Sequence, residues 1–104
     1  MIYNLVSGEL KPGKMAEWSE IVSNEFMPFL PRLGFKPVAS FHAYTGNMNQ
    51  MYWLFAYDDL TSMKKILDGA GKDPEYRRIM AKILSLIVNQ TFTLVEPNPW
   101  SPMK

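Results

Sequence analysis

The residues able to do acid–base or metal chemistry are few, and histidine is the first to consider. His42 is the only histidine among the 104 residues, and the chain has no cysteine. These counts exclude disulfides, thiolate nucleophiles and cysteine-containing metal sites, so we predict no metal site. Histidine titrates near physiological pH, which makes His42 a candidate general base. The alternative is a partly buried histidine that is bonded to a neighbour and has no chemical role.

Two groups of acidic residues are a second candidate for acid–base chemistry. Asp58 and Asp59 precede one predicted helix, and Asp73 and Glu75 lie at the start of another. Carboxylates at helix starts cap free backbone N–H groups and complement the helix dipole. We therefore interpret both groups as helix caps. No glycine-rich nucleotide motif follows a predicted strand, and we expect no cofactor.

Aromatic residues with polar tips are the clearest indication of a ligand site. Phe, Trp and Tyr make up 13% of the chain, and eight methionines accompany them. Such side chains form an adaptable lining for an apolar ligand, although the same residue types also fill cores and interfaces. The candidate pocket residues are Trp18, His42, Trp53 and Tyr57. Of these, His42 and Tyr57 are the candidate catalytic residues, since either side chain can move a proton.

Composition and charge exclude several classes of partner. Hydrophobic residues make up 47% of the chain and charged residues 20%, as in an ordinary globular domain. The net charge of +1 is far from the basic surplus that binds phosphate backbones, so we expect no nucleic-acid partner. Polar residues interrupt the longest uncharged stretch, 37–57, which excludes a membrane span there. Residues 1–13 lack the pattern of a signal peptide, and we expect a cytoplasmic protein.

The periodicity of apolar residues predicts six elements that position these side chains. Runs rich in β-branched and aromatic residues alternate with runs whose apolar residues recur every three or four positions. We predict a first helix that loosens at Pro28 and Pro31 and ends at Gly34, and a second helix that is broken at residues 68–71. A domain of residues 1–97 precedes an extended proline-rich arm, residues 98–104. The predicted strands are 2–10, 35–45, 50–57 and 89–96, and the predicted helical stretches are 14–33, 60–67 and 74–88.

The order βαββαβ predicts an α+β, ferredoxin-like subunit with two helices on one face of a four-stranded antiparallel sheet. The predicted strands, however, are apolar on both faces, whereas a sheet with one face in water alternates apolar with polar residues. In residues 35–45, strict alternation places Phe35, Ala39 and Phe41 on one face and Val38 and Tyr44 on the other. Leaving such a face in water would forgo on the order of 10 kcal/mol. We therefore predict a homodimer whose sheets face each other, a dimeric α/β barrel.

The chain contains, in this order, the segments Met1-Ile2-Tyr3, Leu10 to Lys14, Trp18, Pro28 to Phe35, Asn49-Gln50, Ala56 to Leu60 and Asp73-Pro74-Glu75. Together these segments resemble the NIPSNAP family over nearly the whole chain. The resemblance implies the dimeric α/β barrel superfamily, whose related members include cofactor-free monooxygenases, haem-degrading enzymes and small-molecule decarboxylases or isomerases. Those proteins hold their ligands between sheet and helices. Relatives often carry a histidine in the third strand, where this chain reads Trp53 to Tyr57 without one.

Two functional hypotheses of different classes follow. The first is a barrel that binds a small, mostly apolar molecule between sheet and helices, with cofactor-free oxygenation or isomerisation as its chemistry if it is an enzyme. The second is a non-catalytic interaction module, in which the aromatic faces are structural. In that case the arm, with Trp100, docks on the dimer partner or on another protein.

Overall fold

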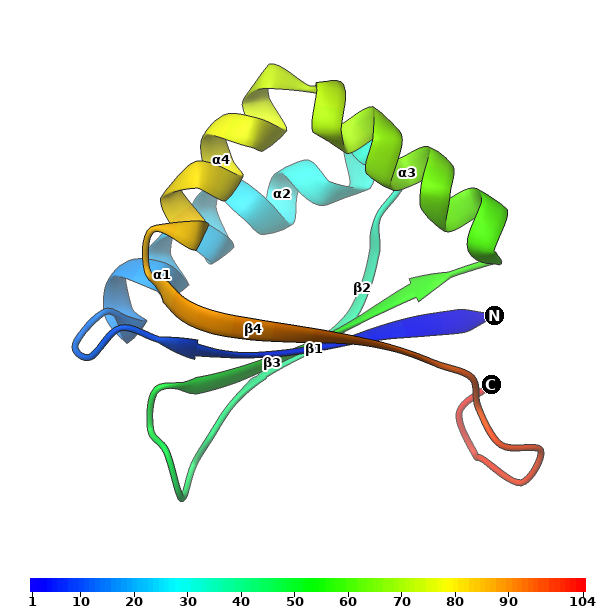
Figure 1. The fold of residues 1–104 in the computed structure, drawn as a ribbon, viewed down its shortest axis with the longest axis horizontal. Coiled ribbons are helices and arrows are strands. Elements are labelled where there is room, and N and C mark those ends of the chain that lie inside the picture. Colours follow the sequence, from blue (N-terminus) through cyan, green and yellow to red (C-terminus); the bar gives the residue numbers. More distant parts are fainter.

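The computed structural model describes residues 1–104, and its strands form one antiparallel sheet in the order β2-β3-β1-β4. All the helices cover one face of this sheet (Figure 1). The fold is therefore the predicted α+β, ferredoxin-like subunit, with connectivity βαββαβ. The strands are β1 (Ile2–Leu10), β2 (Lys36–His42), β3 (Gln50–Tyr57) and β4 (Ile87–Val95).

The first helical segment changes its winding along its length. It consists of α1 (Met15–Ile21), the π-helical turn η1 (Val22–Phe26), α2 (Met27–Phe29) and the 3₁₀ turn η2 (Leu30–Leu33). In the π-helical turn, the Met27 N–H donates to the Val22 carbonyl, five residues back. Pro28 has no N–H to donate, and its ring crowds the preceding turn, which favours this wider winding. The segment ends at Gly34 with φ of 91°, so the predicted loosening and stop are confirmed.

The second helical segment contains α3 (Leu60–Lys72) and α4 (Pro74–Leu84). Asp59 caps α3 by accepting the Ser62 N–H at 2.7 Å. Asp73 caps α4 by accepting the N–H groups of Glu75 and Tyr76 at 2.9 and 3.0 Å. The predicted capping role of Asp59 and Asp73 is thereby confirmed.

Two predicted boundaries in this half of the chain are wrong. The predicted split of the second helix is confirmed, but it lies at Asp73 and not at residues 68–71, because α3 continues through Gly69 and Gly71 to Lys72. Ala70 between these glycines is almost fully buried, so packing of the helix offsets the low helix propensity of glycine. The second helix also ends at Leu84 and not at Val88. Residues from Ile87 onward already pair with β1, which stabilises them as strand.

The inner face of the sheet packs against the helices and carries alternate residues of the strands. Most of these residues are apolar. In β3 these are Met51, Trp53, Phe55 and Tyr57, all of them buried. In β2, the predicted grouping of Phe35, Ala39 and Phe41 on one face is wrong. The register against β3 shifts between Pro37 and Ala39, so Ala39 and Phe41 pair with outer-facing Leu54 and Tyr52. Phe35 stays in the core.

The outer face of the sheet, opposite the helices, is apolar over β2, β3 and part of β1, and polar at Ser7, along β4 at Thr91 and Thr93, and at one end. The apolar residues are Leu5 and Tyr3 of β1, Ala39 and Phe41 of β2, and Tyr52 and Leu54 of β3. Phe41 is 58% exposed. At the polar end, Glu9 accepts hydrogen bonds from Asn47 and Asn89 at 2.7 and 3.4 Å.

The C-terminal arm returns to the outer face and is not extended as predicted (Figure 1). A turn forms where the Ser101 N–H donates to the Asn98 carbonyl at 2.9 Å, with Pro99 in the position that its fixed φ favours. The Tyr3 hydroxyl then donates to the Lys104 carbonyl at 2.5 Å, and Tyr3 is buried. Trp100 remains 80% exposed.

Candidate functional site

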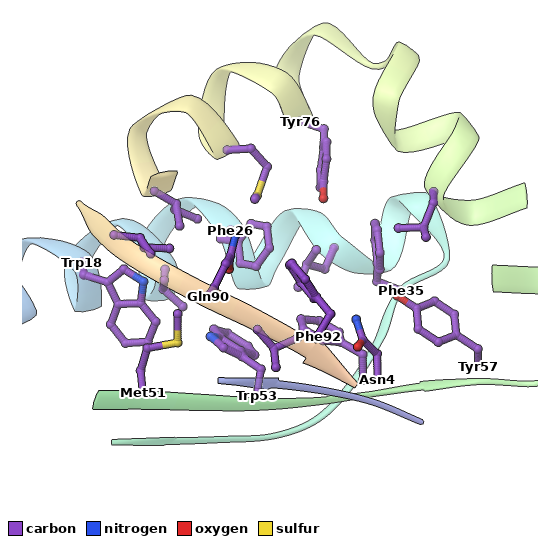
Figure 2. Close-up of a pocket in the computed structure, with 18 residues that line it drawn as sticks. Asn4, Trp18, Phe26, Phe35, Met51, Trp53, Tyr57, Tyr76, Gln90 and Phe92 are labelled. Atoms are coloured by element: carbon purple, nitrogen blue, oxygen red, sulfur yellow. The ribbon is translucent and has the colours of Figure 1, made fainter. Parts of the chain in front are cut away.

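A cavity of about 200 Å³ lies between the inner face of the sheet and the helices (Figure 2). Eighteen residues line it, and sixteen of them are hydrophobic. The two polar ones are Asn4 on β1 and Gln90 on β4. Ligand pockets in proteins are typically concave, mostly apolar and provided with a few polar groups that orient the ligand, and this cavity has that composition.

The helical wall of the cavity depends on the π-helical turn. Trp18, Val22, Phe26 and Leu30 all line the cavity and are spaced by four residues. In a regular α-helix, each step of four residues drifts by about 40° around the axis. The wider turn over Val22–Phe26 reduces this drift, so four successive side chains stay on the face that looks toward the sheet.

Aromatic contacts fix the walls relative to each other. The Trp53 indole stacks on Phe55 with ring centroids 5.3 Å apart and receives Phe26 edge-on at 5.9 Å. At the other end, Phe35 stacks on Tyr76 of α4 with centroids 5.8 Å apart and planes inclined by 11°. These pairs connect the first helical segment, α4 and the sheet. Packed aromatic rings therefore form the walls of the cavity in the absence of a ligand.

An ion cluster outside the cavity connects the first helical segment to α4. Glu25 in η1 accepts hydrogen bonds from Lys82 and Arg78 of α4, at 3.2 and 3.1 Å. Arg78 also bonds Glu75 on its own helix. The hydrogen bonds from Lys82 and Arg78 hold the pKa of Glu25 below its ordinary value, so Glu25 is charged at neutral pH.

Two buried polar atoms of the cavity lining have no hydrogen-bond partner in the protein: Asn4 Oδ1 and Trp18 Nε1. Buried polar atoms in folded proteins are nearly always hydrogen-bonded, and leaving one unpaired costs about 1–3 kcal/mol. Figure 2 shows both side chains directed into the space between sheet and helices. Both atoms belong to residues of the cavity lining, where a bound molecule is the group that could supply the missing partner.

Two tyrosines add hydroxyl groups to the apolar lining. Burial, and to a lesser extent the nearby Tyr76, raises the pKa of Tyr57 to about 12. Burial also raises the pKa of Tyr76. Both hydroxyls are therefore protonated at neutral pH and can donate a hydrogen bond or a proton, whereas neither is a base.

The structure brings together three of the four residues that the sequence proposed for a pocket. Trp18, Trp53 and Tyr57 all line the cavity. His42 does not, because it lies near the end of edge strand β2, where it is exposed. It lines a separate shallow hollow, together with Met15, Tyr44, Met48 and Asn49.

Sequence reasoning missed Asn4, Tyr76 and Gln90 as lining residues. A signal for Asn4 was present, since it occupies an inward position between Ile2 and Val6 in an otherwise apolar strand face. Gln90 carried no comparable signal, because polar residues surround it in the sequence.

The solvent-exposed part of the cavity lining lies on α3 and β4. Leu67 of α3 and Phe92 of β4 are the only lining residues that are exposed. No group of three or more His, Cys, Asp or Glu side chains lies close enough together to hold a metal ion. No helix combines the length and apolar character needed to cross a membrane.

Fold and cavity together define a ferredoxin-like α+β subunit that encloses an apolar space between its sheet and its helices. The sequence profile of the NIPSNAP family matches residues 3–102. The chain belongs to the NIPSNAP family.

Solved structures agree with this assignment at the level of the fold. A NIPSNAP family protein of unknown function from Agrobacterium tumefaciens superposes with a TM-score of 0.92 at 23% identity, covering 100% of this chain and 94% of that one. A NIPSNAP domain protein from Burkholderia xenovorans gives 0.90 at 18% identity, with 98% and 99% covered. An antibiotic biosynthesis monooxygenase gives 0.71 at 11% identity, with 95% and 100% covered. No curated protein sequence matched the chain.

Proposed function

We propose that this protein binds a small, mostly apolar molecule in the cavity between its sheet and its helices. The observation that supports this function best is the cavity itself, of about 200 Å³, with sixteen hydrophobic lining residues and two unpaired polar atoms. For comparison, an engineered apolar cavity of roughly 150 Å³ binds benzene. A bicyclic aromatic molecule is therefore a suitable probe of the space.

A cavity-filling substitution tests this proposal. Val22 is buried and lines the cavity, so Val22→Phe adds a ring inside it. Val38 is exposed on β2, away from the cavity, and Val38→Phe is the matched control. Naphthalene should bind the unmodified protein and the control with similar affinity and lose at least about 10-fold with Val22→Phe. Failure of naphthalene to bind the folded, unmodified protein would contradict the proposal.

The catalytic form of this proposal is cofactor-free oxygenation by dioxygen, or isomerisation, of the bound molecule. Its support is the fold shared with an antibiotic biosynthesis monooxygenase and the protonated hydroxyl of Tyr57 in the cavity lining. For oxygenation, a CH₂ group of the substrate and O₂ give C=O and water; in either reaction the Tyr57 hydroxyl donates a proton to the substrate and takes one back as the product forms. His42, the other proton-transfer candidate from the sequence, lines the separate hollow and not this cavity, so this form gives it no role. Once a substrate is known, Tyr57→Phe should lower turnover at least 10-fold, and an unchanged rate would remove this role.

We further propose that the protein forms a homodimer through the outer face of the sheet. The outer face has an apolar region containing Leu5, Phe41 and Tyr52, and a polar end at Glu9, as interfaces commonly do. Light scattering should give about 24 kDa, two subunits of 12.0 kDa each. Phe41→Lys should shift the mass toward one subunit, whereas Leu60→Lys, at an exposed apolar position on α3, should leave it unchanged. A single-subunit mass for the unmodified protein at micromolar concentration would refute the dimer.

The second candidate function is a non-catalytic interaction module that uses the arm, residues 98–104. The observation that favours it is the exposure of Trp100 on an arm that is itself held to Tyr3. Tryptophan is a common anchor at protein interfaces. Truncation after Glu96 should weaken association by a few kcal/mol, whereas binding of naphthalene should persist. An unchanged association constant would exclude the arm from the interface.

A further inference from the structure

We propose that the molecule bound in the cavity is an uncharged, flat, mostly aromatic compound with a hydrogen-bond acceptor at one end and a donor at the other. The acceptor meets Trp18 Nε1, and the donor meets Asn4 Oδ1. This inference rests on the proposed binding function and specifies the chemistry of its ligand. It is carried by the two unpaired atoms and by what lies between them.

Trp18 requires an acceptor because the indole nitrogen is a donor only. The side chain is 6% exposed, and its N–H has no partner among the surrounding protein groups. Its ring is fixed by the edge-on contact with Trp53, with centroids 6.2 Å apart. The N–H therefore has a defined direction, and it points into the cavity (Figure 2).

Asn4 requires a donor at its carbonyl oxygen. It lies on β1 in a central position of the sheet, where Phe55 of β3 and Leu94 of β4 are its register partners. Neither neighbour has a side chain that can hydrogen-bond, which explains why Asn4 Oδ1 is buried without a partner. A polar residue that is unpaired in a folded protein and faces a cavity is well placed to meet a ligand.

The two atoms do not satisfy each other, because they lie apart along the cavity. Figure 2 shows Trp18 and Asn4 on opposite sides of the Trp53 ring. The space between them is bounded by the rings of Trp53, Phe26 and Phe92. Aromatic walls favour a flat aromatic body, which can stack or meet ring edges, over a flexible chain.

The ligand is uncharged because the cavity lining contains no charged side chain. Burial of a charge without a counter-charge is strongly unfavourable. The hydroxyls of Tyr57 and Tyr76 stay protonated at neutral pH and therefore do not supply a negative charge. A carboxylate or ammonium group on the aromatic body would consequently oppose binding.

Four bicyclic probes of almost equal shape test this inference by calorimetric titration. Naphthalene has no hydrogen-bonding group, quinoline has an acceptor nitrogen, naphthol has a hydroxyl donor, and a hydroxyquinoline with the hydroxyl on the ring opposite the nitrogen has both. Each added hydrogen bond should strengthen binding by about 2- to 10-fold. The hydroxyquinoline should therefore bind about 4- to 100-fold more tightly than naphthalene.

Two variants assign each gain to its atom. Trp18→Phe removes the indole N–H and should abolish the advantage of quinoline over naphthalene, while naphthalene still binds. Asn4→Leu removes the acceptor and should abolish the advantage of naphthol while leaving that of quinoline. The probe series on the unmodified protein remains decisive should either variant fail to fold.

The outcomes separate this inference from the function on which it rests. Equal affinities for all four probes, or weaker binding of the hydroxyquinoline than of naphthalene, would overturn the donor–acceptor assignment while the binding function stands. If no probe binds, the cavity is not a ligand site and both proposals fail.

Discussion

The indole of Trp18 meets the indole of Trp53 edge-on, with ring centroids 6.2 Å apart and planes inclined by 75°. This contact joins α1 to the centre of β3 and forms one wall of the cavity. Since Phe26 and Phe55 also contact Trp53, this ring connects the core to the candidate site. Stability and binding should therefore depend on the same side chain.

The first prediction concerns this ring. Trp53→Ala removes a buried indole and should lower the free energy of unfolding by about 3–5 kcal/mol, as measured by urea denaturation. Tyr44→Ala is the aromatic control, because Tyr44 is 95% exposed, and it should change stability by no more than about 0.5 kcal/mol. Similar effects of the two substitutions would mean that the Trp53 wall is loosely packed.

The second prediction compares two glycines. A methyl group at Gly8 would lie 2.9 Å from the Asn89 carbonyl oxygen and 2.8 Å from the Met51 methyl, so Gly8→Ala should destabilise the protein by about 1–3 kcal/mol. Gly69 lies within α3 and has no atom within 4 Å of the added carbon. Gly69→Ala should stabilise the protein by about 0.5–1 kcal/mol. Urea denaturation of both variants should give changes of opposite sign.

The third prediction concerns the cap of α4. Asp73 accepts two backbone N–H groups, so Asp73→Ala should lower the free energy of unfolding by about 1–2 kcal/mol, whereas Asp73→Asn should retain most of it. Asp68→Ala, within α3, is a control at which no hydrogen bond is lost. Loss of stability in both Asp73 variants would indicate that charge and not the acceptor oxygen matters.

The fourth prediction concerns alkaline pH. The pKa of Tyr57 is raised from its ordinary value of 10 to about 12 in the folded protein. Between these values the unfolded chain releases the Tyr57 proton while the folded protein keeps it, so the free energy of unfolding falls as the pH rises. The fall due to Tyr57 should not exceed about 2–3 kcal/mol. Tyr57→Phe should flatten the stability profile between pH 10 and 12, whereas Tyr44→Phe should leave it unchanged.

The order of strands and helices could be predicted from the sequence, because residue type and apolar spacing within each segment indicate its secondary structure. Stretches rich in β-branched and aromatic residues became strands, and the apolar spacing of 14–33 became a helical segment that loosens near Pro28. The boundaries failed where long-range contacts decide the conformation. Burial of Ala70 keeps α3 intact across two glycines, and pairing with β1 turns Ile87 and Val88 into strand. No local pattern contains those contacts.

The candidate site was predictable in its aromatic part and not in its polar part. Trp18, Trp53 and Tyr57 were identified by residue type, and the structure places all three around one cavity. The register shift near Val38 moves the odd-numbered residues of β2 from the inner face of the sheet to the outer face. The position of His42 could therefore not be predicted from simple alternation. Whether Asn4 lacks a partner depends on atoms from three strands and a helix, which no sequence pattern brings together.

The exposed part of the cavity lining has a consequence for the size of molecule that can be accommodated. Leu67 and Phe92 are the only exposed residues of the lining, and they lie on α3 and β4. We expect a planar ring to enter past these two side chains by a change of rotamer, without unfolding of a helix. A substituent attached to that ring can project past the same side chains. The volume of the chamber therefore limits the head of the guest and leaves the length of its tail unrestricted.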